Sequence, residues 1–174
     1  MADAVFSDDR ARPTDPIGRT LDLASRLFAI CSGLMLIAMA LMSVYSIAAR
    51  SLIGKPLLGD YEMVQMMSAI AVSMALPFCQ MIGGHIIVDF FTVKLPARVN
   101  AVLDLIAALL LATGALAIAW RVFGATLELY RNHDATMLLN LPTWWGYAPM
   151  GPSFLLLGLA ALYTAWQRAR EIGA

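Results

Sequence analysis

Charge is scarce in this sequence, and its scarcity excludes the common soluble classes. Of 174 residues only 14% are charged, whereas 60% are hydrophobic. Soluble domains carry roughly 25% charged and about 45–50% apolar residues. No cluster of lysines and arginines forms the basic patch that a phosphate backbone requires, so no nucleic-acid partner is predicted. The composition is typical of an integral membrane protein whose first partner is the lipid bilayer.

Cysteine is almost absent as well. Cys31 and Cys79 both lie within apolar runs, which predicts small buried residues and neither a disulfide framework nor a zinc site. The start of the chain also lacks the short apolar core of a cleaved signal peptide. We therefore expect residues 1–26 to form a polar cytoplasmic segment that leads into an uncleaved first span.

Four apolar stretches dominate what is present. About 20 helical residues cross the ~30 Å hydrocarbon layer at ~1.5 Å per residue. Asp60 is a candidate N-cap for the second stretch, with Glu62 in its first turn. The predicted fold is an all-α integral membrane protein, with a four-helix membrane domain over residues 27–168 and a cytoplasmic tail over 169–174. The spans are expected at about 27–49, 63–84, 101–121 and 144–166.

The basic residues predict the orientation of these spans. With both termini in the cytoplasm, eight of the 12 lysines and arginines lie inside and four lie outside. Because cytoplasmic loops carry the excess of lysine and arginine, this arrangement is favoured.

The segment of about 85–95 is neither wholly apolar nor simply polar. In a helix, His85 and Asp89 would share one polar stripe while Phe90 and Phe91 would lie on the opposite apolar stripe. The segment is too short to span a membrane, so we expect an amphipathic arm helix at the cytoplasmic interface. A local hydrogen bond between His85 and Asp89 is the simplest role for that pair.

Aromatic residues flank the last span at both ends. The first group is Trp144, Trp145 and Tyr147, and the second is Tyr163 and Trp166. Tryptophan and tyrosine concentrate at membrane interfaces, so these groups are predicted to form the two aromatic belts.

No Asp, Glu, Lys, Arg or His lies in the middle of any predicted span. Ion-coupled carriers usually hold such a residue at membrane depth. The two histidines, His85 and His133, fall at opposite faces, roughly 30 Å apart, and cannot share one haem iron. We therefore predict no catalytic, metal or cofactor site and no enzymatic activity.

Three local motifs together resemble a known family. The first is Arg50 with Gly54-Lys55-Pro56 and then Asp60-Tyr61-Glu62. The second, and most specific, is Gly84-His85-Ile86-Ile87-Val88-Asp89 followed by Leu95-Pro96. The third is Asn140-Leu141-Pro142-Thr143-Trp144-Trp145-Gly146-Tyr147 with Pro149. Over about residues 25–168 the chain is similar to the small membrane subunit of tripartite ATP-independent periplasmic (TRAP) transporters, the DctQ-like family.

The resemblance implies a division of labour. A large membrane subunit would hold the substrate and the sodium ions, a periplasmic binding protein would deliver an organic acid, and this chain would be their scaffold. It would lie in the inner membrane of a bacterium or archaeon. The arm would be formed by His85, Asp89, Phe90 and Phe91. Candidates for docking the binding protein are Asp60, Glu62, Arg121, Arg131 and Asp134.

A second hypothesis is a self-contained four-helix transporter or channel. Proteins of that size usually keep an acidic residue within a span, which the predicted spans lack. Transport by the purified chain alone would distinguish this hypothesis from the scaffold.

Overall fold

All the named secondary-structure elements within the parts of the chain that the structure describes are α-helices. The computed structural model describes residues 16–54, 58–82 and 97–173. Their elements are α1 (Pro16–Ile53), α2 (Asp60–Met81), α4 (Ala97–Asn132), α5 (Trp144–Tyr147) and α6 (Met150–Gly173). The all-α prediction is confirmed for these residues.

Four of the helical segments are long and apolar enough to cross a membrane. The third runs on to Asn132, well past the predicted end at 121, and the first begins at Pro16. The fourth is interrupted, because α5 ends at Tyr147 and α6 begins only at Met150. Pro149 lies in that interruption and has no backbone N–H to continue a helix.

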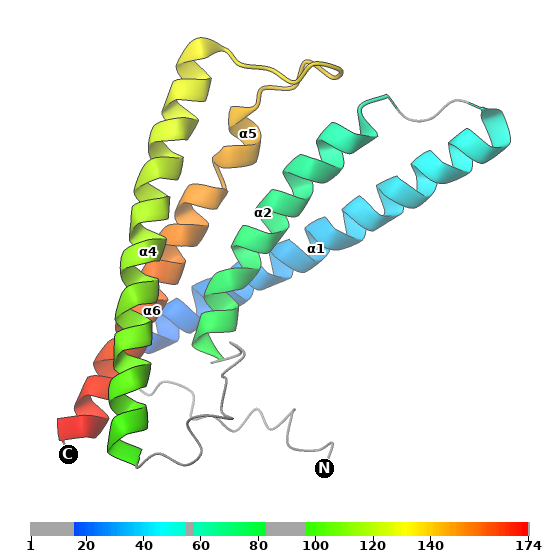
Figure 1. Ribbon diagram of the computed structural model, residues 1–174. Coiled ribbons are helices and arrows are strands. Elements are labelled where there is room, and N and C mark those ends of the chain that lie inside the picture. The colour runs from blue at the N-terminus through cyan, green and yellow to red at the C-terminus, as the bar shows by residue number, and fades with distance from the viewer. Residues whose placement is uncertain (1–15, 55–57, 83–96, 174) are drawn as a thin grey trace, which may run out of the picture.

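The helices form two antiparallel pairs. Helix α4 packs against α6 along most of its length, and α1 packs against α2. Helix α2 also contacts α6 and joins the pairs, whereas α1 lies on the outside of the bundle (Figure 1). We call the end that holds residues 133–143 the loop end. The opposite end, where α1 begins and α6 finishes, is the terminal end.

Small side chains form the seam between α1 and α2. Gly18, Ser25, Ser32 and Ser46 follow one another at multiples of seven residues and are all buried. A seven-residue repeat keeps one helix face against a partner, and small residues let two backbones approach closely. The Ser32 hydroxyl donates to the Ala71 carbonyl across this seam at 2.7 Å.

The pair α4 and α6 is closely packed for the same reason. Ala112, Ala115 and Ala119 are buried on α4 at the 3–4 spacing of one helix face. A Cβ on Gly158 of α6 would lie only 2.8 Å from the Leu116 side chain of α4. These two helices therefore form the most tightly packed part of the bundle.

Glycines set the ends of the first two helices. Gly54 follows α1 at φ 71°, and its N–H donates to the Arg50 carbonyl, as a left-handed helix-ending glycine does. Gly59, at φ 77°, is the N-cap of α2. The expectation that Asp60 would be the N-cap is wrong, because Asp60 is the first helical residue and its side chain bonds elsewhere.

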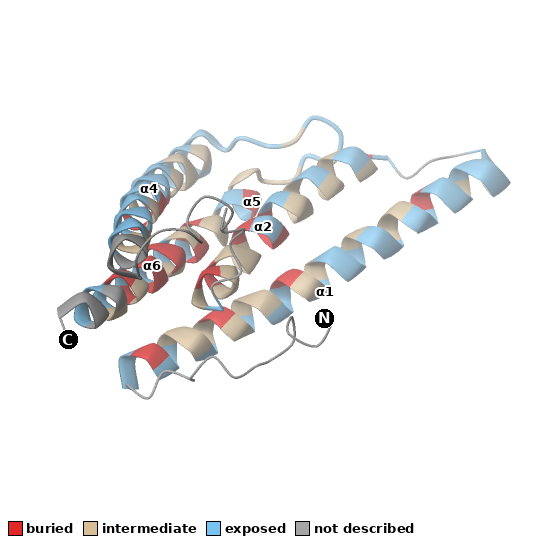
Figure 2. Cartoon of the chain, turned by 60° about the horizontal axis from the view of Figure 1, so that its bottom comes forward, coloured by how far each residue is buried: buried red, intermediate tan, exposed pale blue. Residues whose placement is uncertain are grey.

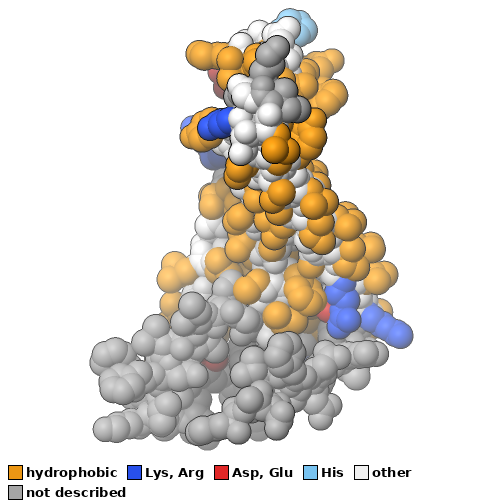
Figure 3. Space-filling model, turned by 90° about the vertical axis from the view of Figure 1, so that its right-hand side faces the viewer, with side chains coloured by type: hydrophobic (Ala, Val, Ile, Leu, Met, Phe, Trp, Pro, Cys, Tyr) orange, Lys and Arg blue, Asp and Glu red, His pale blue; other side chains and the backbone are white. Residues whose placement is uncertain are grey.

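The outer surface suits a lipid environment. Burial is confined to the facing sides of the helices, and α1 is mostly exposed or half-buried (Figure 2). Hydrophobic side chains occupy the middle of the face in Figure 3, while lysine or arginine side chains lie towards its two ends. The expectation for the cysteines is wrong at Cys31, which is exposed, whereas Cys79 is half-buried and both are free.

Candidate functional site

The loop end holds several polar contacts between segments of the chain. The crossing loop, residues 133–143, leaves α4 and runs over the start of α2 before it enters α5 (Figure 1). Thr136 and Leu141 hold the loop in a narrow hairpin, because the Thr136 N–H donates to the Leu141 carbonyl at 2.9 Å. The Leu141 N–H returns a bond to the Thr136 hydroxyl.

The loop begins at a specific helix end. His133 adopts a left-handed φ of 52°, its N–H donates to Tyr130, and the next N–H, that of Asp134, donates to Leu129. This pair of bonds is the Schellman arrangement that ends many helices. Helix α4 therefore ends at Asn132, where His133 and Asp134 turn the chain into the crossing loop.

Glu62 ties the loop to α2. Its carboxylate accepts the N–H of Leu138 at 3.0 Å and that of Leu139 at 3.2 Å. Hydrogen bonds to an ionised acceptor are stronger than neutral ones. Glu62 therefore acts as a clamp on the crossing loop and is already engaged within the chain.

Gly59 makes room for the same loop. A Cβ on this residue would lie 2.7 Å from Cδ1 of Leu139. Both the positive φ and the contact require glycine. The close approach lets Leu139 cover the start of α2.

Asp60 holds the two helices of the first pair together. Its carboxylate accepts the Ser46 hydroxyl at 2.6 Å, a bond between α1 and α2. Ser46 belongs to the small-residue seam and is 2% exposed. Asp60 and Glu62 thus face different neighbours, one bonding α1 and the other the crossing loop.

A cavity of about 360 Å³ lies beneath the clamp. Methionines from three segments, Met66, Met137 and Met150, contribute to its wall beside Glu62 and Tyr147. Gly146 lies close against Met66, since a Cβ on this glycine would be 3.4 Å from Cγ of that methionine. Within the described ranges, no group of three or more His, Cys, Asp or Glu residues is placed to hold a metal ion.

The predicted aromatic groups do gather at the two ends of the bundle. At the loop end, Trp144 packs edge-on against Tyr130 and against Trp145, with ring centroids 5.6 and 6.1 Å apart. At the terminal end, Tyr163 and Trp166 lie 6.1 Å apart. The guanidinium of Arg170 lies 3.8 Å from the Trp166 ring centroid, a cation–π contact.

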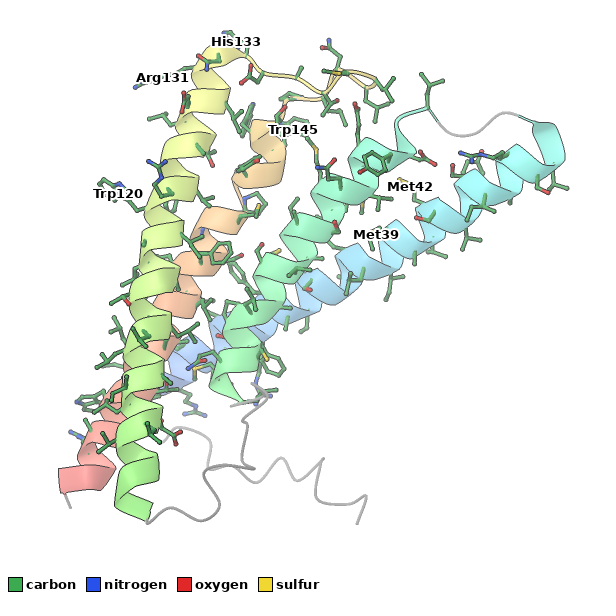
Figure 4. The ribbon with its side chains drawn as sticks, viewed as in Figure 1. Met39, Met42, Trp120, Arg131, His133 and Trp145 are labelled. Atoms are coloured by element: carbon green, nitrogen blue, oxygen red, sulfur yellow. The ribbon has the colours of Figure 1, made fainter. Side chains whose placement is uncertain are left out.

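The other predicted docking residues lie on α4 and just after it. Arg131 is exposed in the last turn of α4 (Figure 4). Asp134 is exposed in the crossing loop. Arg121 lies farther down α4, on an exposed face. The structure does not bring these three residues together with Asp60 and Glu62 into one patch.

The predicted arm lies outside the described residues. His85, Asp89, Phe90 and Phe91 all fall between 83 and 96, so their roles stay predictions.

Sequence reasoning missed the clamp formed by Glu62 and the role of Gly59. The one available signal was Gly59-Asp60-Tyr61-Glu62, a glycine before acidic residues at the start of an apolar run. That pattern indicates a helix start, but it does not show that a loop about 76 residues later supplies the bonding partner.

Comparison with protein families decides the identity of this four-span chain. The family model described as tripartite ATP-independent periplasmic transporters, DctQ component, matches residues 39–171. The chain belongs to this DctQ family. Comparison with curated proteins and with solved structures gives no match.

The family match covers the structural features described above. It includes α1 from residue 39 onwards and all of α2, α4 and α5, together with nearly all of α6. Ser46, Asp60, Glu62 and the crossing loop therefore all lie within the DctQ region. The DctQ component described here is a multi-pass membrane protein and a part of a transporter.

Proposed function

We propose that this DctQ component is the non-catalytic scaffold of a sodium-coupled, binding-protein-dependent importer of organic acids. In this proposal a large membrane subunit carries the substrate and the sodium ions, and a periplasmic protein delivers the substrate. The DctQ component supports the large subunit in the inner membrane and binds no cofactor of its own.

The observation that carries the proposal is that polar side chains bond the segments of the bundle to one another. Ser32 bonds α1 to α2, and Gln80 of α2 donates to Thr164 of α6 at 2.9 Å. Glu62 bonds α2 to the crossing loop. These groups fix helices relative to one another, which supports a static supporting body.

Membership of the DctQ family supports the proposal of two protein partners, the large membrane subunit and the periplasmic binding protein. A transporter described as tripartite has three components, of which this chain is one. The mostly exposed apolar surface of α1 suits lipid, and the outward face of α4 leaves area for a larger membrane protein.

The direct test is reconstitution. The chain is co-expressed with a tagged large subunit from the same gene neighbourhood, and the purified complex is placed in liposomes with the cognate binding protein. We expect co-purification and uptake of a radiolabelled organic acid that requires a sodium gradient and all three proteins.

Two outcomes would contradict the proposal. One is a stable chain that never associates with the large subunit. The other is uptake by the chain alone, which would instead support a self-contained transporter.

A further inference from the structure

Arg121 is a charged residue inside a membrane-spanning helix. It lies nine residues before Tyr130 (121 to 130), which packs against Trp144 in the loop-end aromatic group. At ~1.5 Å per residue the Cα of Arg121 is therefore about 13 Å below that group along α4. Such a group marks the membrane interface. Two residues further along α4, Phe123 packs on Gly151 in the first turn of α6.

The direction of α4 makes it harder for Arg121 to reach water. Helical Cβ atoms tilt towards the N-terminus of their own helix. Helix α4 begins at the terminal end, so the Arg121 side chain starts out away from the nearby loop end. No hydrogen bond or ion pair joins Arg121 to another residue of the described ranges. A charge at this depth is costly unless it is paired.

The face of α4 around Arg121 changes character along its length. In the half nearer the terminal end, the face opposite α6 carries the exposed apolar side chains of Leu103, Ile106 and Leu110. Beyond them the same face carries Gly114, Ala117, Arg121, Gly124 and Glu128 at 3–4 spacing. Gly114 and Gly124 have nothing within 4 Å of a Cβ position.

A groove of about 590 Å³ runs along this second half of the face. Ala117, Gly124 and Ala125 line it, Arg121 and Glu128 contribute its charges, and Trp120 forms a wall. Trp120 is 80% exposed and points away from α6 (Figure 4). Tryptophan and arginine are the residues most enriched at the energetic centres of protein interfaces.

The charges decide what can fill this groove. A second copy would have the same orientation in the membrane, so a two-fold axis along the membrane normal would bring Arg121 opposite Arg121 and Glu128 opposite Glu128. Like charges at one depth repel. A lipid tail could fill the groove but would leave the guanidinium unpaired. A helix that carries a carboxylate would fill the groove and also pair with the guanidinium of Arg121.

We propose that this groove docks a transmembrane helix of the large transporter subunit, and that a carboxylate of that helix pairs with Arg121. The small residues let the two helices approach closely, and Trp120 packs along the side of the incoming helix. This inference rests on the proposed scaffold function and adds the site and the chemistry of the contact.

The test compares variants of the chain in co-purification with the tagged large subunit. Gly124→Leu fills the groove and Arg121→Met removes the charge, and each is expected to lower recovery of the complex by about tenfold or more. Arg121→Lys keeps the charge and should retain most of the complex. Gly33→Leu is the matched control, because Gly33 lies in α1 with nothing within 4 Å of its Cβ position. Its recovery should equal that of the wild type.

A second measurement does not depend on whether those variants fold. A photo-activated cross-linking residue replaces Ala117 in the groove, and Ile37 of exposed α1 serves as the control. We expect the Ala117 position to give an adduct with the large subunit. An adduct with a second copy, or with lipid only while the complex is intact, would overturn the docking site. If the wild-type chain forms no complex at all, the scaffold proposal fails first and the docking site with it.

Discussion

Three glycines of this chain differ in what they do for their backbone. Gly59 needs both a positive φ and empty space next to Leu139, Gly54 needs only the positive φ, and Gly33 needs neither. Comparing substitutions at these three glycines therefore separates the effect of backbone strain from the effect of a steric contact.

Alanine substitutions at these positions should follow that order in stability. Gly33→Ala should raise the free energy of unfolding by up to about 1 kcal/mol, because alanine favours helix. Gly54→Ala should lower it by about 1–2 kcal/mol through the left-handed conformation. Gly59→Ala should lower the free energy of unfolding by about 1–3 kcal/mol more than Gly54→Ala does, because Leu139 must also move. Unfolding of the purified chain in mixed detergent micelles measures all three, and equal losses at Gly54 and Gly59 would show that Leu139 adapts freely.

At the scale of an element, the seam between α1 and α2 uses its serines unequally. Ser32 bonds the Ala71 carbonyl, and Ser46 bonds Asp60. Ser25 is fully buried in the same register, and its hydroxyl finds no partner within the described residues.

Replacing these serines with alanine should expose the difference. Ser32→Ala should cost about 0.6–1 kcal/mol, the usual strength of a hydrogen bond between membrane helices. Ser25→Ala should be neutral or stabilising, because it removes an unpaired buried hydroxyl. The same unfolding measurement applies, and a larger loss at Ser25 than at Ser32 would contradict the roles given to them.

The helices themselves could be predicted because their signals are local. Long uncharged runs and helix-breaking residues such as Asn132-His133-Asp134 lie within one stretch of sequence. The contacts of Glu62 and Gly59 could not be predicted, because their partners, Leu138 and Leu139, lie about 76 residues or more away. The pairing proposed for Arg121 could not be predicted either. The predicted third span ended at that residue, whereas α4 continues to Asn132 and places it well inside the helix.

At the scale of the whole molecule, the aromatic groups and the helix lengths predict that the two ends of the bundle lie at the two membrane interfaces. Which end faces the cytoplasm is a prediction from the distribution of lysine and arginine. The loop end is expected outside, and both termini inside.

Cysteine labelling in intact cells tests this orientation. In a chain with Cys31→Ala and Cys79→Ala, an added His133→Cys at the loop end should react with a membrane-impermeant maleimide. Ala169→Cys, exposed near the terminal end, should react only after the cells are permeabilised. The reverse pattern would invert the topology and move the docking groove to the opposite half of the membrane.

The clamp between Glu62 and the crossing loop also dictates an order of assembly. The first two spans can enter the membrane as a hairpin while later residues are still being synthesised. Leu138 reaches Glu62 only after the third span has crossed as well. Until then the second span begins with a carboxylate that only water satisfies, and the arrival of the crossing loop is the step that gives this carboxylate its partners within the chain, just before the fourth span enters the membrane.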